Sequence, residues 1–184
     1  MLHMMSRGGT NRLTNKFVIA LTETIDRLAK EKVALVIAGN DKFFSAGAEL
    51  NEIATLDGPS AYEFAQMGQN LMRAVAVFSA PTYAAITGYC MGGGLDLALA
   101  CGYRVAAPHA VFGHRGAALG LITGWGGTQR LPRLIGKGRA MEMFVAAEKV
   151  TAARGLGIGL IDAISDEPVA ECIRRIRKAP RVQD

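Results

Sequence analysis

The sequence predicts an α/β fold with mostly parallel strands, because segments with helical spacing of apolar residues alternate with short, continuous apolar runs. A second observation is the glycine triplet Gly92-Gly93-Gly94, which separates one apolar run from the next and is followed by a single acid. The 184 residues, 50% of them hydrophobic, suffice for one domain with a substantial core.

The first half of the chain holds two helix–strand pairs. Apolar residues recur at helical spacing over residues 17–28, directly after Thr14, which suits a helix N-cap. Residues 33–38 form a continuous apolar run of strand length that ends at a turn containing glycine. Residues 59–75 and 82–86 repeat this order of amphipathic helix and buried strand.

The second half begins with a buried helix, predicted over residues 95–100 after the glycine triplet. Residues 124–130 are rich in glycine and predict a tight loop that enters a helix. The remaining predictions are strands at 103–107, 110–112 and 160–164, and helices at 139–147, 151–157 and 168–178.

The glycine triplet predicts exposed backbone amides at the start of a helix. Glycine lets the main chain approach a ligand closely, and the first amides of a helix have no internal partner and carry the positive end of its dipole. Such amides suit a developing oxyanion, with Asp96 one turn away. The alternative is a flexible turn, which is less consistent with a position between a buried strand and a buried helix.

Composition indicates which ligands, partners and cellular compartments suit the chain. The 21 Lys and Arg against 16 Asp and Glu give a net charge of +5, which favours an anionic ligand such as a phosphorylated cofactor. Nucleic acid is not expected as a partner, because aromatic and basic residues are not interleaved. The three cysteines show no metal-ligand spacing, so we expect no metal site, no disulfide framework and a reducing cytoplasm. No apolar segment reaches the roughly 20 residues of a membrane span, and no signal peptide precedes residue 12.

Three motifs occur in one order with consistent spacing, at residues 43–50, 88–96 and 119–131. Together they resemble the enoyl-CoA hydratase/isomerase (crotonase) superfamily over about residues 10 to 165. The resemblance implies a spiral of repeated β-β-α units and a homo-trimer that often pairs into a hexamer. It also implies an acyl-CoA thioester as ligand, with CoA arriving as part of the substrate and no permanently bound cofactor.

The resemblance also implies roles for particular residues. The backbone amides of Ala48 and Gly93 would polarise the thioester carbonyl as an oxyanion hole. Asp96 would be the catalytic acid or base, although an acid in a first helical turn also stabilises the helix without chemistry. The expected substrate contacts are Lys42, Ala46, Gly92, Gly116 and Trp125.

The sequence departs from the family pattern at both catalytic carboxylates. Hydratases of the family carry a glutamate just after the glycine triplet and a second one after the next strand; here these positions are Asp96 and Gly116. Two-carboxylate hydration is therefore not expected. His114, two residues before the missing acid, is a candidate proton shuttle, and the alternative is a loop histidine with a structural hydrogen bond.

The two ends of the chain also differ from the family pattern. We expect residues 1–165 to form a crotonase-like core that lacks the N-terminal strands, and residues 166–184 to begin a truncated C-terminal helical segment. The expected function is hydration of a 2-enoyl-CoA to a 3-hydroxyacyl-CoA. Two alternatives stay open, a double-bond isomerase, which can work with one base, and a non-catalytic protein that binds CoA thioesters.

Overall fold

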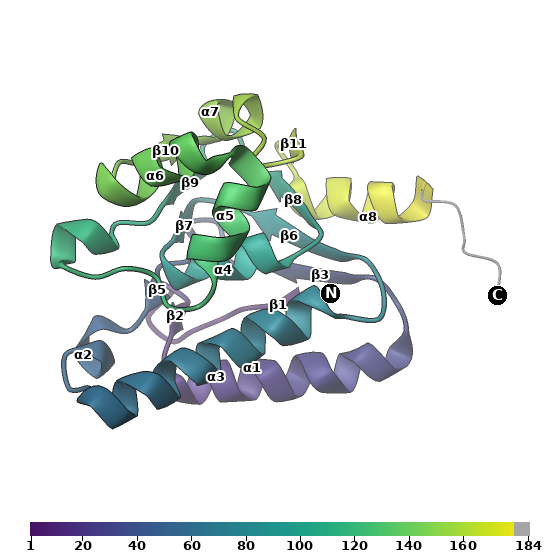
Figure 1. The fold of residues 1–184 in the computed structure, drawn as a ribbon. Helices are drawn as coiled ribbons and strands as arrows, with labels where there is room; N and C mark the ends of the chain where they lie inside the picture. Colours follow the sequence, from purple (N-terminus) through teal and green to yellow (C-terminus); the bar gives the residue numbers. More distant parts are fainter. Residues whose placement is uncertain (179–184) are drawn as a thin grey trace.

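A five-stranded parallel sheet forms the frame of the molecule in the computed structural model, which describes residues 1–178 (Figure 1). Its strands lie in the order β1-β3-β6-β8-β11, and every neighbouring pair is parallel. The bounds are β1 (Leu2–His3), β3 (Leu35–Ala38), β6 (Thr82–Ile86), β8 (Tyr103–Ala106) and β11 (Ala163–Ile164).

A second sheet has four strands in the order β10-β9-β7-β4, and β2 pairs with β5 beside it. These strands are β4 (Phe43–Ser45), β7 (Tyr89–Met91), β9 (Val111–Gly113), β10 (Val150–Thr151), β2 (Arg12–Leu13) and β5 (Gly47–Ala48). The pairs β3 and β4, β6 and β7, and β8 and β9 each send their first strand to the large sheet and their second to the smaller one. This repeated arrangement confirms the predicted spiral and its mostly parallel strands.

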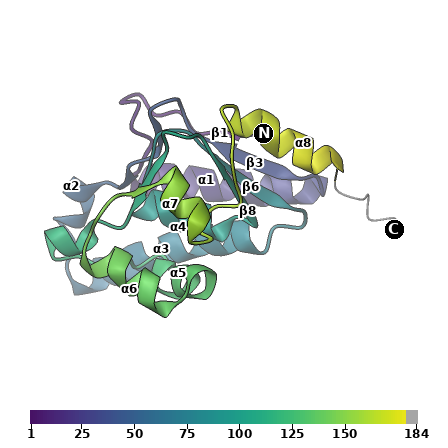
Figure 2. The same ribbon diagram turned by 90° about the horizontal axis from the view of Figure 1, so that it is seen from above.

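Two long helices, α1 (Asn15–Leu28) and α3 (Gly58–Ala76), lie side by side on one face of the large sheet (Figures 1 and 2). The Thr14 hydroxyl accepts a hydrogen bond from the Phe17 amide at 3.2 Å, as expected of the predicted N-cap. The remaining helical elements are η1 (Ala29–Glu31), α2 (Leu50–Ile53), α4 (Gly93–Ala100), η2 (Gly116–Leu119), α5 (Gly127–Ile135), α6 (Lys137–Val145), α7 (Ala152–Gly157) and α8 (Pro168–Lys178).

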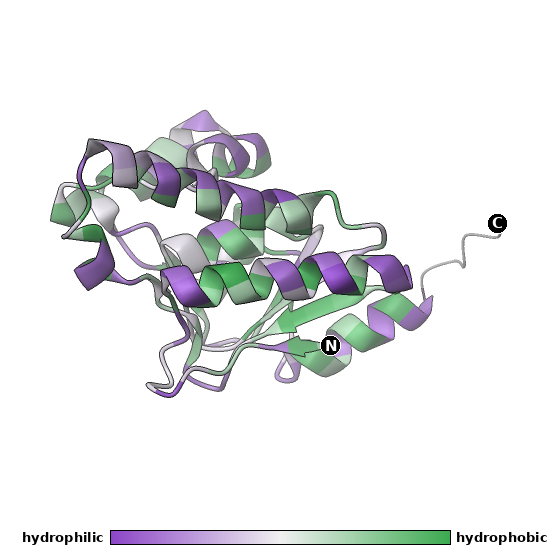
Figure 3. Ribbon diagram, turned by 90° about the horizontal axis from the view of Figure 1, so that it is seen from below, coloured by the Kyte–Doolittle hydropathy of each residue, from purple (hydrophilic) through white to green (hydrophobic). Residues whose placement is uncertain are grey.

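The large sheet is buried on both faces, because helices cover each one. Ile37 and Ile86 belong to the main core with α1, α3 and α4, whereas the alternate residues Val36 and Ala85 pack with Cys172 of α8. In Figure 3 the strands of this sheet are green, and the outer helices carry purple on the sides away from the core. All eight residues of α4 are buried, so this helix lies inside the molecule and fixes the glycine triplet at its N-terminus.

The structure corrects the expectation at the N-terminus. That end was expected to lack strands, yet β1 pairs with β3 through Leu2 and Ile37, and β2 pairs with β5. Each of these strands has two residues, which is too short for a recognisable alternation of apolar and polar side chains. The helix expected at the other end is α8, and residues 179–184 of that segment lie outside the described residues.

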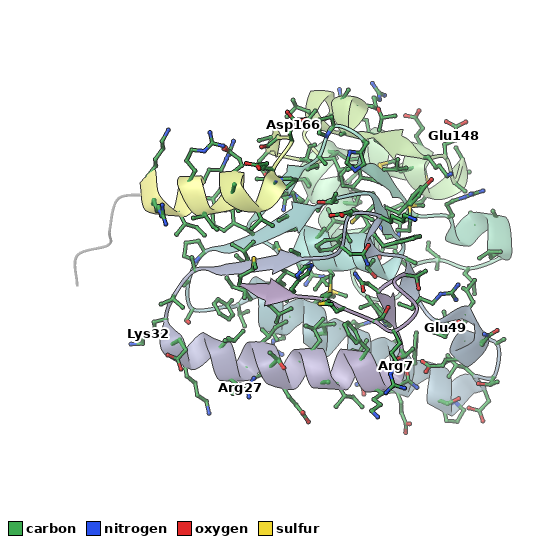
Figure 4. All side chains as sticks on the ribbon, turned by 180° about the vertical axis from the view of Figure 1, so that it is seen from behind. Arg7, Arg27, Lys32, Glu49, Glu148 and Asp166 are labelled. Carbon is green, nitrogen blue, oxygen red and sulfur yellow. The ribbon has the colours of Figure 1, made fainter. Side chains whose placement is uncertain are left out.

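Charged side chains gather on the outside of the molecule. Figure 4 labels six of them, including Arg27, Lys32 and Glu148, at its periphery. Within residues 1–178 no helix has the length and apolar character needed to cross a membrane. In the same residues no group of three or more His, Cys, Asp or Glu side chains is placed to hold a metal ion.

Candidate active site

A cavity of about 990 Å³ opens where the N-terminus of α4 meets β5, α3, the segment 114–125, α5 and α6. Apolar side chains make up most of its lining, among them Phe64, Trp125 and Phe144. Asp96 is the single carboxylate that lines it within the part of the chain that the structure describes. The cavity therefore surrounds one acid with apolar walls, a common arrangement for a small-molecule site.

Two backbone segments meet at one end of this cavity. Gly93 is the first residue of α4, so its amide has no acceptor within the helix. A Cβ added to Gly93 would lie 3.5 Å from the Ala48 amide nitrogen and 2.6 Å from the Trp125 ring. Gly47 has φ +90°, and a Cβ there would lie 3.1 Å from the Gly93 nitrogen. The amides of Ala48 and Gly93 are thus neighbours in space because glycine permits this close approach.

Asp96 lies one helical turn further along α4 and is 1% exposed. Burial raises the pKa of its carboxyl from 3.8 to about 7, and the Thr123 hydroxyl and the charge of Arg130 oppose this increase. The Thr123 hydroxyl donates a hydrogen bond to Asp96 Oδ2. The carboxyl therefore changes its protonation near neutral pH, where a general acid or base is most effective.

His114 follows β9 and faces the other oxygen of the carboxyl. Its Nε2 lies 3.4 Å from Asp96 Oδ1, and neither atom has a hydrogen-bond partner among the described residues. Burial lowers the pKa of His114 to about 4, so the imidazole is neutral at physiological pH. The structure therefore brings both predicted catalytic residues together, with two unpartnered polar atoms beside the cavity.

The predicted substrate contacts divide into two groups. Ala46, Gly92, Gly116 and Trp125 all line the cavity, whereas Lys42 is exposed and does not. A Cβ at Gly116 would lie 2.6 Å from the Leu121 carbonyl oxygen, so the backbone here leaves no room for a second acid.

Trp125 is 3% exposed and is fixed as a wall of the cavity. Its Nε1 donates to the Phe64 carbonyl at 3.2 Å, and the two rings lie 5.1 Å apart. Gly68 of α3 makes room for the indole, because a Cβ there would come within 2.2 Å of the ring. The indole is thus held in the cavity wall by one hydrogen bond and by close packing, and its contact with substrate stays a prediction.

Sequence reasoning missed Thr123 and Arg130. Arg130 donates to the carbonyls of Trp125 and Met72, and its charge stabilises the ionised carboxyl of Asp96. Both residues lie within the motif at 119–131, but nothing in their spacing indicates contact with α4. Four cations that also line the cavity were not predicted as contacts: Arg12, Arg115, Arg133 and Lys137.

Comparison with known proteins identifies the family of the chain. The family model described as enoyl-CoA hydratase/isomerase matches residues 2–180. A crotonyl-CoA hydratase of Syntrophomonas wolfei is 40% identical over 131 residues, which are 71% of this chain and 50% of the relative. A probable enoyl-CoA hydratase of Bacillus subtilis is 36% identical over 170 residues, 91% of this chain and 66% of the relative.

Among solved structures, an enoyl-CoA hydratase from Thermoplasma volcanium is similar with a TM-score of 0.91 and 30% identity. The match covers 97% of this chain and 73% of that one. The chain spans between half and two thirds of the length of the two curated relatives above. Because the family model covers nearly all of its residues, the chain belongs to the enoyl-CoA hydratase/isomerase family.

Proposed function

We propose that the protein hydrates 2-enoyl-CoA thioesters with a single carboxylate. The observation that carries this proposal is the position of Asp96, a buried acid with a pKa near neutrality, in the same cavity as the neighbouring amides of Ala48 and Gly93. Two preorganised amide donors stabilise an oxyanion, and the acid moves the proton. All three similar proteins named above are hydratases by name, which agrees with this assignment.

The proposed reaction begins with water attacking C3 of the enoyl group. One water proton passes to the Asp96 carboxylate, and the double-bond electrons move onto the thioester oxygen to give an enolate. The amides of Ala48 and Gly93 donate hydrogen bonds to this oxygen. Protonated Asp96 then returns the proton to C2, which restores the thioester and completes a 3-hydroxyacyl-CoA.

His114 positions the attacking water in this proposal. Its imidazole is neutral, since burial lowers its pKa to about 4, so in the tautomer protonated at Nδ1 its Nε2 accepts a hydrogen bond from water. Asp96 Oδ1 lies 3.4 Å away and accepts the other hydrogen. One water shared by these two atoms satisfies both unpartnered groups.

A double-bond isomerase is the second candidate, favoured by the absence of a second carboxylate among the described residues that line the cavity. Moving a proton between C2 and C4 requires one base, and the oxyanion hole stabilises the same enolate. The two reactions are distinguished by comparing turnover of 2-enoyl thioesters, the substrates of hydration, with turnover of 3-enoyl thioesters, the substrates of isomerisation. A protein that only binds thioesters would not accelerate exchange of the α-proton with solvent deuterium.

The deciding experiment is hydration of crotonyl-CoA by the wild-type chain and by Asp96→Asn. We expect the variant to lose about 10²- to 10⁴-fold in kcat, the typical contribution of a general acid–base group. Asp26→Asn, at an exposed position of α1, is the matched control for loss of one negative charge. If wild-type and Asp96→Asn proteins bind the thioester and turn over at the same rate, Asp96 has no role in chemistry.

The remaining features of the proposal concern the state of the protein in the cell. We propose that it works without a permanently bound cofactor and takes CoA only as part of its substrate. A cytoplasmic location is supported by three cysteines that are all buried and unpaired. A homo-trimer or hexamer is supported by the exposed apolar side chains of Leu119, Ile122, Met141 and Val145, and sedimentation measures it directly.

A further inference from the structure

Asp96 presents its two carboxyl oxygens to different surroundings. Oδ2 accepts a hydrogen bond from the Thr123 hydroxyl, whereas Oδ1 has no partner among the described residues and lies 3.4 Å from His114 Nε2. A carboxylic acid places its proton on the oxygen that is free of donors, because the other oxygen already accepts a hydrogen. The hydrogen bond from Thr123 therefore distinguishes the two oxygens.

The loop that carries Thr123 is fixed on both of its sides. Gln69 of α3 donates to the Gly124 carbonyl at 2.8 Å, and Trp125 Nε1 donates to the Phe64 carbonyl. Before Thr123, the Leu121 amide donates to the Gly116 carbonyl at 2.8 Å. Hydrogen bonds to α3 and η2 therefore fix the backbone around residue 123, and this backbone does not depend on the Thr123 hydroxyl.

The Thr123 side chain is held in one orientation as well. Its methyl carbon lies 2.8 Å from the place where a Cβ at Gly127 would be, so it packs against this glycine of α5. Branching at Cβ limits threonine to few rotamers, and the methyl contact selects the one that aims the hydroxyl at α4. Gly127 also leaves space for Asp96 Oδ1, since the same Cβ would lie 2.1 Å from that oxygen.

We propose that Thr123 is a positioning residue, which holds Asp96 by Oδ2 and leaves Oδ1 as the oxygen that exchanges protons beside His114 in the cavity. The reaction served by this orientation rests on the function proposed above. The hydroxyl also favours the ionised form of Asp96 by donating to it, so its removal raises the proton affinity of the carboxyl.

Other groups around Asp96 remain in place when the hydroxyl is removed. Arg130 and the Gly127 backbone amide of α5 favour the carboxylate. Cys90 of β7 is buried with the pKa of its thiol well above the usual value, and neutral His114 follows β9. Arg12 of β2 is paired with Glu49 at 2.8 Å. A change in the titration of Asp96 therefore reports on the hydroxyl at residue 123.

The test compares Thr123→Val, which keeps the methyl contact, with Thr123→Ser, which keeps the hydroxyl. The pKa of Asp96 is read by carbon-13 NMR of protein labelled at the aspartate carboxyls, with the signal assigned from Asp96→Asn. We expect Thr123→Val to raise this pKa by about one unit, typical for loss of a hydrogen bond to an ionised group. Thr123→Ser keeps the hydroxyl but loses the methyl contact that orients it, so it should raise the pKa by a smaller amount. Thr128→Val, which removes a hydroxyl elsewhere in the cavity lining, controls for polarity.

The acid limb of the kcat/KM profile for crotonyl-CoA should move upward in pH by the same amount, with kcat changing more than KM. Equal pKa values for Asp96 in wild type and Thr123→Val would overturn the proposal. If Thr123→Val does not fold, Thr123→Ala is compared with Thr123→Ser, because both lack the methyl group and they differ only in the hydroxyl. A raised Asp96 pKa in a protein without hydratase activity supports the role of Thr123 and rejects the proposed reaction, so the two failures are distinguishable.

Discussion

The two sides of the cavity are built from different parts of the chain. The amide side consists of backbone, with Ala48 on β5 and Gly93 at the start of α4, and its shape depends on glycines that allow close approach. The acid side consists of side chains, with Asp96 of α4 brought together with Thr123 and His114 from two separate loops. The first is fixed by main-chain geometry, whereas the second depends on burial and on a few hydrogen bonds.

This difference explains where the chain follows the family pattern and where it departs from it. An oxyanion hole made of backbone requires small residues at fixed positions, and those positions are filled as the family resemblance implies. Proton transfer by side chains accepts other residue types, provided that the pKa and the distance suit the reaction. Here Asp96 keeps a carboxyl, while Gly116 faces the Leu121 backbone and provides none.

The largest expected effect comes from disturbing the amide side with Gly93→Ala. The new Cβ would lie 2.6 Å from the Trp125 ring and 3.5 Å from the Ala48 amide nitrogen, where our proposal places the thioester oxygen. We expect crotonyl-CoA turnover to fall by about 10²- to 10³-fold, the usual effect of losing one oxyanion-hole donor. Steady-state kinetics measure the loss.

Gly138→Ala is the control for this change, because a Cβ in that part of α6 meets no atom within 4 Å. It should retain wild-type turnover and gain slightly in helix stability. A Gly93→Ala protein with full activity would show that this amide does not bind the thioester oxygen.

The acid side predicts an opposing pair of pH effects on stability. The pKa of Asp96 rises on folding from 3.8 to about 7, so the folded state holds more protons and its stability falls as pH rises through this range. The pKa of His114 falls from 6.5 to about 4, so the folded state holds fewer protons and stability falls as pH drops. Between about pH 4 and 6.5 the two slopes offset each other in the wild type.

Single variants separate these slopes. Asp96→Asn keeps only the histidine, so the free energy of unfolding of this variant should rise with pH. His114→Gln keeps only the acid, so the free energy of unfolding of this variant should fall as pH rises. Each slope approaches about 1.4 kcal/mol per pH unit, the value for one proton. Urea unfolding at several pH values between 4 and 6.5 measures both. Parallel pH profiles for the two variants would contradict the assigned protonation states.

Trp125 joins the two sides, and its replacement should have an intermediate effect. Trp125→Phe keeps a ring beside Gly93 but loses the Nε1 hydrogen bond to the Phe64 carbonyl. We expect the free energy of unfolding to fall by about 1–2 kcal/mol, from one lost hydrogen bond and a smaller buried side chain. Urea denaturation measures this change, with Tyr62→Phe at an exposed position of α3 as the control. Equal losses in the two variants would argue against a packed wall at residue 125.

Periodicity predicted the long elements well, because each buries one face or a continuous run. The predicted helix at 59–75 is α3, and the strand at 82–86 coincides with β6. The short strands β4, β5 and β7 were missed, since two or three residues beside glycines carry no measurable period. Their pairing depends on contacts between distant segments, which local patterns do not contain.

The site divides in the same way. Gly93 and Asp96 belong to one motif, so their relation to the helix start could be inferred from local sequence alone. The hydrogen bond between Thr123 and Asp96 joins residues 27 positions apart, and no local sequence pattern predicts it. Burial of the carboxyl, which moves its pKa, likewise results from packing by several elements.

Replacement of Lys42 should have the smallest effect on the kinetics, and it tests a substrate contact that was predicted only from proximity to a motif. Lys42 is one of the substrate contacts that the sequence predicts, yet its side chain is exposed and does not line the cavity. We expect Lys42→Gln to change KM for crotonyl-CoA by less than about threefold, because an exposed single charge contributes little. Arg133→Gln, which alters a cation in the cavity lining, is the comparison and should raise KM more. A larger effect at residue 42 would place the CoA phosphates near the start of β4 rather than along the lined cavity.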